Sequence, residues 1–265
     1  GIAILLEAGV PPGVVQLLPG RGETVGAQLT GDDRVRGVMF TGSTEVATLL
    51  QRNIASRLDA QGRPIPLIAE TGGMNAMIVD SSALTEQVVI DVLASAFDSA
   101  GQRCSALRVL CLQDEIADHT LKMLRGAMAE CRMGNPGRLT TDIGPVIDSE
   151  AKANIERHIQ TMRSKGRQVF QAVRENSEDA REWQSGTFVA PTLIELDDFA
   201  ELQKEVFGPV LHVVRYNRNQ LPELIEQINA SGYGLTLGVH TRIDETIAQV
   251  TGSAQVGNLY VNRNM

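Results

Sequence analysis

The chain has 265 residues, 43% of them hydrophobic, which is enough material for one large domain or two smaller ones with buried cores. Its 24 basic and 32 acidic residues give a net charge of −8, which excludes a general attraction to nucleic acid or to an anionic membrane surface. No apolar run reaches the roughly 18 to 20 residues that cross a bilayer. Cys104, Cys111 and Cys131 are too few and too irregularly spaced for a disulfide framework or a CxxC metal site, so we expect a reducing, cytoplasmic setting and no metal.

The first part of the chain alternates between helical and extended patterns. Helices are predicted over 2–8 and 44–58, and strands over 37–40 and 66–70. An apolar segment at 13–18 and a polar loop lie between the first helix and the first strand. Alternation of this kind is typical of a parallel sheet with crossover helices.

The alternation continues as a second α/β unit. Strands or extended segments are predicted at 76–79, 108–112, 168–173, 188–196, 207–216, 235–240 and 258–262, and helices at 85–99, 116–131, 149–165, 222–230 and 245–250. The charged and polar residues 174–186 are predicted to form a solvated surface loop. Because the chain opens without a helix start signal and stops directly after a strand-like segment, we expect it to be a piece of a longer protein.

Two short motifs stand at the ends of predicted strands. At Thr41-Gly42-Ser43 a glycine turn leads into a helix, whose free backbone N–H groups suit an anionic phosphate, although Ser43 fits an ordinary helix cap as well. Glu70 precedes Gly72 and Gly73, so its carboxylate has the freedom to act as a general base. A surface glutamate before a turn is the alternative for Glu70.

Two further motifs lie later in the chain. Cys104 follows the predicted helix 85–99 and Gly101, and a cysteine nucleophile needs both exposure and a means of forming the thiolate. The alternative is a small buried hydrophobic residue. The carboxylate of Glu205 suits the two hydroxyls of a ribose, and Phe207 supplies a flat wall for a ring, but the segment also fits a simple turn between strands.

Taken in order, the strings FTGS, ETGG, GQRC and EVFGPV resemble the aldehyde dehydrogenase superfamily over the whole chain. The resemblance implies an aldehyde dehydrogenase-like α/β fold with three parts. These are a partial Rossmann-type NAD-binding domain at 1–70, an α/β catalytic domain at 71–257, and the start of a truncated C-terminal oligomerisation segment at 258–265. It also implies a site in the crevice between the domains and a parent protein that forms a homo-oligomer.

The resemblance also implies roles for individual residues of an oxidoreductase. Cys104 attacks the aldehyde, hydride passes to NAD, and Glu70 activates the water that hydrolyses the resulting thioester. The backbone N–H of Cys104 is one expected donor to the oxyanion. The residues assigned to the cofactor are Thr41, Gly42, Ser43, Glu205 and Phe207. NAD is expected rather than NADP on the family branch alone.

A narrower resemblance concerns the substrate. The segment 144–155 and Arg103-Cys104-Ser105 are similar to 1-pyrroline-5-carboxylate (L-glutamate γ-semialdehyde) dehydrogenases, which implies Arg103 and Ser105 as substrate contacts. The segment 71–75 and the stretch through His158 are similar to the dehydrogenase module of bifunctional enzymes of proline catabolism. In those enzymes FAD belongs to a separate proline dehydrogenase part, and the whole protein is cytoplasmic or peripheral at the inner membrane. The family's asparagine oxyanion donor and ribose-binding lysine have no counterpart within this chain, so the isolated chain is expected to be inactive.

Other functions stay open at this point. One is oxidation of a different aldehyde. Another is a thiol hydrolase or acyltransferase, in which Cys104 is paired with a histidine. The candidate histidines lie on amphipathic helices or in apolar strand-like runs, where surface or core roles are simpler; they are His119, His158, His212 and His240. A third alternative is a segment that serves only folding or assembly.

Overall fold

The computed structural model describes residues 1–172 and 186–265. The predicted surface loop therefore lies outside the described residues, except for Gly186, as does the last residue of the predicted strand 168–173. The chain forms two compact units, Gly1–Thr71 and Gly72–Met265, which are described separately below.

The first unit contains a two-stranded parallel sheet. Strand β1 (Val38–Thr41) pairs with β2 (Leu67–Glu70), and helix α3 (Thr44–Ile54) forms the crossover between them. Parallel pairing requires such a crossover, because a tight hairpin joins only antiparallel strands. The small core combines residues of all three elements and the segment before β2: Leu50, Ile54, Ile65, Val38, Phe40 and Leu67.

Two sequence predictions for this unit were wrong in part. The predicted polar loop contains a π-helical turn (Gly22–Gly26) that leads into helix α2 (Ala27–Gly31). The predicted helix 44–58 stops at Ile54, because Leu58 instead forms an isolated bridge with Pro64. The apolar segment 13–18 forms no strand among the described residues and leaves its large side chains exposed. Helix α1 (Ile2–Glu7), in contrast, was predicted correctly to within one residue.

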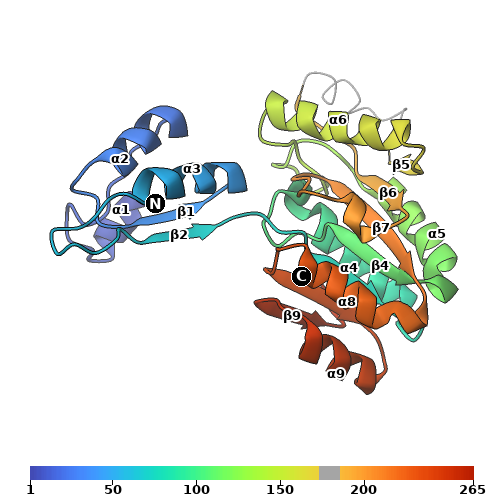
Figure 1. Ribbon diagram of the computed structural model, residues 1–265. Helices are drawn as coiled ribbons and strands as arrows, with labels where there is room; N and C mark the ends of the chain where they lie inside the picture. Colours follow the sequence, from blue (N-terminus) through green and yellow to red (C-terminus); the bar gives the residue numbers. More distant parts are fainter. Residues whose placement is uncertain (173–185) are drawn as a thin grey trace. The chain divides into compact units, whose positions relative to one another are not determined.

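In the second unit, the described residues form one sheet with the strand order β5-β6-β7-β4-β3-β8-β9 (Figure 1). Every pair is parallel except β5 with β6. The strands are β3 (Ala76–Val79), β4 (Val109–Gln113), β5 (Val169–Gln171), β6 (Thr192–Leu196), β7 (Val210–Tyr216), β8 (Thr236–His240) and β9 (Asn258–Val261). The parallel sheet expected from the alternation is confirmed.

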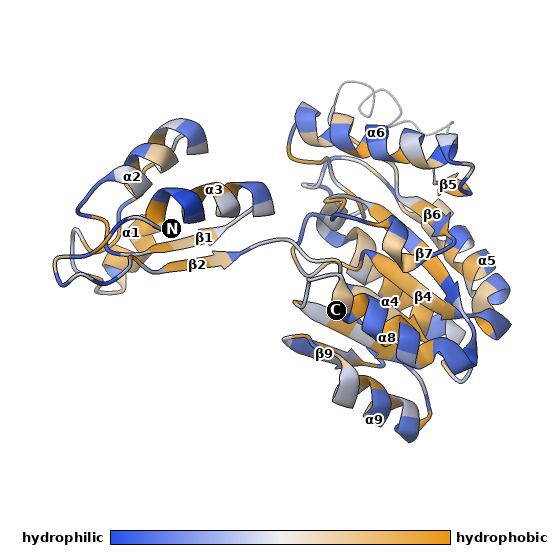
Figure 2. Ribbon diagram, viewed as in Figure 1, coloured by the Kyte–Doolittle hydropathy of each residue, from blue (hydrophilic) through white to orange (hydrophobic). Residues whose placement is uncertain are grey.

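The central strands are buried along their full lengths. Every residue of β3, β4 and β8 is buried, and their sequences are largely continuous apolar runs rather than alternating patterns. Such runs are typical of parallel strands that are covered on both faces. Figure 2 shows the hydrophobic colour on the central strands β4 and β7, with hydrophilic residues on parts of the surrounding helices.

Five helices of the second unit match the predictions within four residues at either end. They are α4 (Thr85–Phe97), α5 (Asp114–Glu130), α6 (Ser149–Ser164), α8 (Leu221–Ala230) and α9 (Asp244–Ser253). Strands β6 and β7 begin later than predicted, directly after Pro191 and Pro209, because proline has no N–H to donate to a sheet. None of the helices in the described ranges is both long and apolar enough to cross a membrane.

Candidate functional site

Helix α4 ends in a left-handed turn that leads the chain to Cys104. Ser99, Ala100 and Gly101 have φ angles of 58°, 54° and 66°. A non-glycine residue costs roughly 1–2 kcal/mol in this region, so the turn needs support from its surroundings. Gly101 also has no room for a side chain, since a Cβ would lie 2.2 Å from the carbonyl oxygen of Gly208. Backbone strain is therefore concentrated immediately before the exposed thiol.

Arg103 supports this turn from the side of α4. Its Nη2 donates to the carbonyl oxygens of Ala94 (3.0 Å) and Ser95 (3.2 Å), which belong to the last turns of the helix. These contacts supply hydrogen-bond donors to carbonyls near the helix end. The guanidinium of Arg103 is thus engaged by α4, and the prediction that Arg103 contacts substrate gains no support from its contacts.

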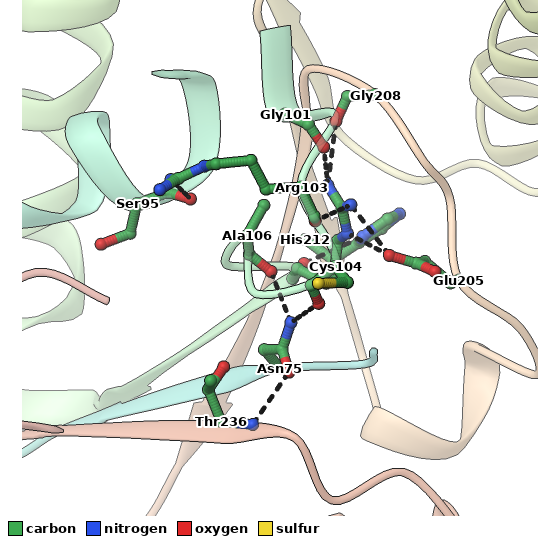
Figure 3. A network of polar contacts seen from close by, with 11 residues as sticks. Asn75, Ser95, Gly101, Arg103, Cys104, Ala106, Glu205, Gly208, His212 and Thr236 are labelled. Carbon is green, nitrogen blue, oxygen red and sulfur yellow. Dashed lines mark hydrogen bonds and ion pairs between the residues drawn. The ribbon is translucent and has the colours of Figure 1, made fainter. Parts of the chain in front are cut away.

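Asn75 supports the Cys104 loop from the side of the sheet. Its Nδ2 donates to the carbonyl oxygens of Cys104 (2.7 Å) and Ala106 (2.9 Å), and its Oδ1 accepts from the backbone N–H of Thr236 (3.2 Å) (Figure 3). Asn75 is buried, so these bonds form away from water and constrain the loop strongly. One side chain thus joins the start of β3, the start of β8 and the loop. Sequence reasoning missed this role, because Asn75 and Thr236 are 161 residues apart.

The three cysteines differ in their surroundings. Cys104 is exposed, Cys111 is buried within β4, and Cys131 is partly buried after α5. Burial raises the pKa of the Cys111 thiol to about 12. The Sγ of Cys131 lies 3.7 Å from the carbonyl oxygen of Ala127, in its own helix. Cys104 alone among the three combines exposure with a fixed backbone, as a nucleophile requires.

We expect limiting iodoacetamide at neutral pH to label Cys104 at least roughly a hundredfold faster than Cys111, because only thiolate reacts and Cys111 is both neutral and buried. A time course of the labelled peptides by mass spectrometry, on the folded full-length protein, measures this ratio. Denaturation in guanidinium is the control and should bring the rates for all three cysteines close together. Faster labelling of Cys111 or Cys131 in the folded protein would contradict the assignment of Cys104 as the nucleophile.

Glu205 lies between a buried arginine and the glycine pair of the ETGG motif. Its Oε1 accepts from Nε (3.0 Å) and Nη2 (2.8 Å) of Arg108. A Cβ on Gly72 would lie 1.6 Å from Oε2, so the carboxylate sits directly against the backbone there. Burial raises the pKa of Glu205, while Arg108 and the N–H of Gly73 act in the opposite direction. The ring of Phe207 is 5.2 Å from the guanidinium carbon of Arg108, a cation–π distance.

The first unit brings the remaining candidates to one end of its sheet. Thr41 is the register partner of Glu70, and the N–H of Gly42 donates to the carbonyl oxygen of Glu70 (3.1 Å). The side chain of Ser43 caps α3 by accepting from the N–H of Val46 (3.2 Å). These residues therefore lie at the carboxyl ends of parallel strands and at a helix N-terminus, where α/β proteins bind phosphate-containing ligands.

The histidines do not form a catalytic pair with the thiol. Nε2 of His158 and Nε2 of His212 are 2.9 Å apart, and Nδ1 of His212 donates to the carbonyl oxygen of Arg108 (3.1 Å). Burial lowers the pKa of His212 to about 3. In the ranges that the structure describes, no hydrogen bond joins a histidine to Cys104, and no group of three or more potential ligands could hold a metal ion. None of the four histidines is therefore hydrogen-bonded to Cys104 in the way that a thiol hydrolase requires.

Comparison with known proteins agrees with these motifs. The chain is 99% identical over 265 residues to the bifunctional protein PutA of Escherichia coli, of which it covers 20%. It is 33% identical over 265 residues to a 1-pyrroline-5-carboxylate dehydrogenase of Bacillus licheniformis, covering 99% of this chain and 50% of that protein. A crystal structure of 1-pyrroline-5-carboxylate dehydrogenase from Thermus with bound NAD superposes with a TM-score of 0.85, at 34% identity, over 99% of this chain and 49% of that one.

The chain thus spans between a fifth and a half of the length of these relatives. Residues 2–265 match the protein family described as "Aldehyde dehydrogenase family". The sheet topology described above agrees with this match, since the NAD-bound Thermus dehydrogenase shares the fold over almost the whole chain. The chain therefore belongs to the aldehyde dehydrogenase family.

Proposed function

We propose that the protein containing this chain oxidises L-glutamate γ-semialdehyde, the open form of 1-pyrroline-5-carboxylate, to L-glutamate with NAD. The observation that carries the proposal is the exposed Cys104 on a strained loop whose carbonyl groups are held by buried side chains. The names of the relatives support the substrate, because PutA is called bifunctional and the Bacillus and Thermus proteins are 1-pyrroline-5-carboxylate dehydrogenases. The bound NAD named for the Thermus protein supports the cofactor.

The residues present fit this cofactor. Arg108 holds the carboxylate of Glu205 and also faces the ring of Phe207, which suits a ribose next to a planar ring. Helix α3 presents its N-terminus after Thr41-Gly42-Ser43, which suits a pyrophosphate. When bound, NAD supplies the hydride acceptor. We assign the pyrophosphate to the residues around Ser43 and the nicotinamide ribose to Glu205.

Cys104 performs the covalent chemistry in this proposal. Its thiolate attacks the aldehyde carbon, so that a C–S bond forms and the carbonyl oxygen becomes an oxyanion near the N–H of Cys104. The oxyanion collapses as the hydride leaves, which gives a thioester on Cys104. Glu70 removes a proton from a water molecule, the water attacks the thioester carbon, and the C–S bond breaks to release the carboxylic acid. Ser105, partly exposed beside the thiol, is proposed to contact the α-carboxylate of the substrate.

Substrate profiling of the full-length protein tests the proposal. With NAD, we expect kcat/KM for L-glutamate γ-semialdehyde to exceed that for propanal by roughly a hundredfold or more, because a site that binds a charged substrate rejects an analogue without the charges. NADH absorbance is the measurement, with NADP as a parallel arm. The isolated 265-residue chain is the comparison, and we expect its turnover to be negligible.

Three results would count against parts of the proposal. Equal kcat/KM values would favour a general aldehyde dehydrogenase, and ester hydrolysis without NADH formation would favour a thiol hydrolase. NADH production by the isolated chain near the full-length rate would contradict its expected inactivity. We include three further properties in this proposal. The protein is cytoplasmic, with or without peripheral attachment to the inner membrane, and it forms a homo-oligomer. It binds FAD outside this segment.

A further inference from the structure

We propose that Arg108 is a positioning residue that couples the carboxylate of Glu205 to the loop carrying Cys104. The inference rests on the proposed function, in which Glu205 binds the nicotinamide ribose and Cys104 is the nucleophile. Arg108 lies outside the GQRC and EVFGPV strings that carry the family resemblance. Its side chain nevertheless contacts residues of both strings.

The first half of the coupling is the ion pair with Glu205. The Arg108 side chain is 1% exposed and that of Glu205 is 12% exposed, so both charges are largely removed from water. Nε and Nη2 of Arg108 converge on the same oxygen, Oε1, while Oε2 lies against the backbone at Gly72. Removing one member of such a pair leaves the other charge buried without a partner. Glu205 therefore depends on Arg108 for its orientation.

The second half is a set of backbone contacts around the thiol. Nη1 of Arg108 donates to the carbonyl oxygens of Gly101 (2.7 Å) and Gly208 (3.2 Å), and Nη2 donates to that of Arg103 (3.1 Å). Together with the two bonds to Glu205, these contacts use all five N–H donors of a guanidinium. Gly101 and Arg103 both lie shortly before Cys104 in the chain. The rigid, planar guanidinium of Arg108 therefore fixes this part of the loop relative to Glu205.

The contact with Arg103 has a direct chemical consequence. In a trans peptide the C=O of one residue and the N–H of the next point in opposite directions. By holding the carbonyl of Arg103, Arg108 directs the N–H of Cys104 away from itself. Across the described part of the chain, this N–H donates no hydrogen bond to a protein group. Arg108 thus orients the free donor that we assign to the oxyanion, while Asn75 holds the carbonyl on the other side of Cys104.

The test uses the full-length protein with Arg108→Met and Arg108→Lys. Methionine removes all five donors, and lysine keeps the charge with only three donors. For Arg108→Met we expect a roughly ten- to hundredfold higher dissociation constant for NAD and a similar fall in kcat per reactive thiol, since small displacements of reacting groups have effects of this size. The dissociation constant and the kcat of Arg108→Lys should lie between those of Arg108→Met and the wild type. Fluorescence titration with NAD and steady-state NADH formation give the two quantities. Molecules in which iodoacetamide labels Cys104 but not the buried Cys111 count the folded sites.

Arg125→Met is the matched control, because Arg125 also pairs with a glutamate, Glu195, but contacts neither Glu205 nor the Cys104 loop. It should leave both quantities unchanged. A second readout is independent of the cofactor. The rate of Cys104 alkylation in the double variant Arg108→Met, Glu205→Gln should differ from the rate in Glu205→Gln alone. The effects of Arg108→Met and Glu205→Gln on NAD affinity should be less than additive, because both disturb the same contact.

The outcomes separate this inference from the proposed function. Wild-type kcat and NAD affinity per reactive thiol in Arg108→Met would overturn the positioning role and leave the proposed function intact. If that variant does not fold, wild-type values in Arg108→Lys would do the same. A wild-type protein that forms no NADH would overturn the proposed function. In that case the alkylation rate still decides whether Arg108 orders the loop.

Discussion

Replacing Cys104 with alanine should lower kcat for NADH formation by the full-length protein by roughly 10⁴- to 10⁶-fold, the range seen when a covalent nucleophile is removed. An aldehyde carbon does not readily surrender hydride, whereas the tetrahedral adduct with a thiolate does, because its oxyanion drives the hydride out. Cys111 cannot replace the missing thiol, since it is buried within β4 and burial raises its pKa to about 12. NADH absorbance at saturating L-glutamate γ-semialdehyde and NAD measures the loss.

Two measurements show whether the loss of activity arises in the chemical step rather than in cofactor binding. NAD affinity of Cys104→Ala should remain close to that of the wild type, because the Glu205 contacts do not involve the thiol. Cys131→Ser is the matched control and should retain activity, since Cys131 lies after α5 and its Sγ is directed at Ala127. Turnover of Cys104→Ala within about a hundredfold of the wild type would mean that another group forms the covalent adduct.

Replacing Gly101 with alanine should both destabilise the protein and lower its activity. At a φ of 66° a side chain costs roughly 1–2 kcal/mol. The new Cβ would also lie 2.2 Å from the carbonyl oxygen of Gly208, a backbone atom that cannot rotate away. Together we expect a loss of about 3–5 kcal/mol, with a shift of the loop that lowers kcat at least roughly tenfold. The temperature at which half of the activity is lost after a fixed incubation, together with kcat at 25 °C, measures both effects.

Gly252→Ala is the matched control for this exchange. Gly252 lies in α9, and a Cβ there would meet nothing within 4 Å. Because glycine is a poor helix former, this variant should be neutral or more stable by about 0.5–1 kcal/mol. If Gly101→Ala behaves like Gly252→Ala in both measurements, the left-handed turn does not constrain the Cys104 loop as described.

Much of the sheet could be predicted from the sequence, because the pattern that forms it is local. Strand β3 was predicted at its observed bounds, since a short apolar run between turn residues leaves little choice. The short helical turns at 22–31 were not predicted. Arg57 helps to hold their end by donating to the backbone carbonyls of Thr30 and Asp32, and these partners are 25 or more residues away in the chain. Local periodicity carries no signal for such a contact.

In the candidate site, too, some residues could be predicted from the local sequence and others could not. Cys104 and Glu205 could be proposed from short strings, although their roles stay predictions that the experiments above test. Arg108 and Asn75 could not, because each joins the Cys104 loop to a partner about a hundred or more residues away, Glu205 and Thr236 respectively. The substrate contact of Arg103 stays a prediction, and in this structure its guanidinium binds carbonyl oxygens near the end of α4. Adjacency in sequence did not predict the direction of its side chain.

The bond between Asn75 and Thr236 also bears on how the protein folds. Asn75 completes its contacts with the Cys104 loop and with β8 only when residues 161 positions apart have met. Contacts at such a separation are costly to form, because a long loop must close before they contribute any stability. During synthesis, Cys104 leaves the ribosome well before β8 does. The Cys104 loop is therefore held from both sides only once β8 has paired with β3.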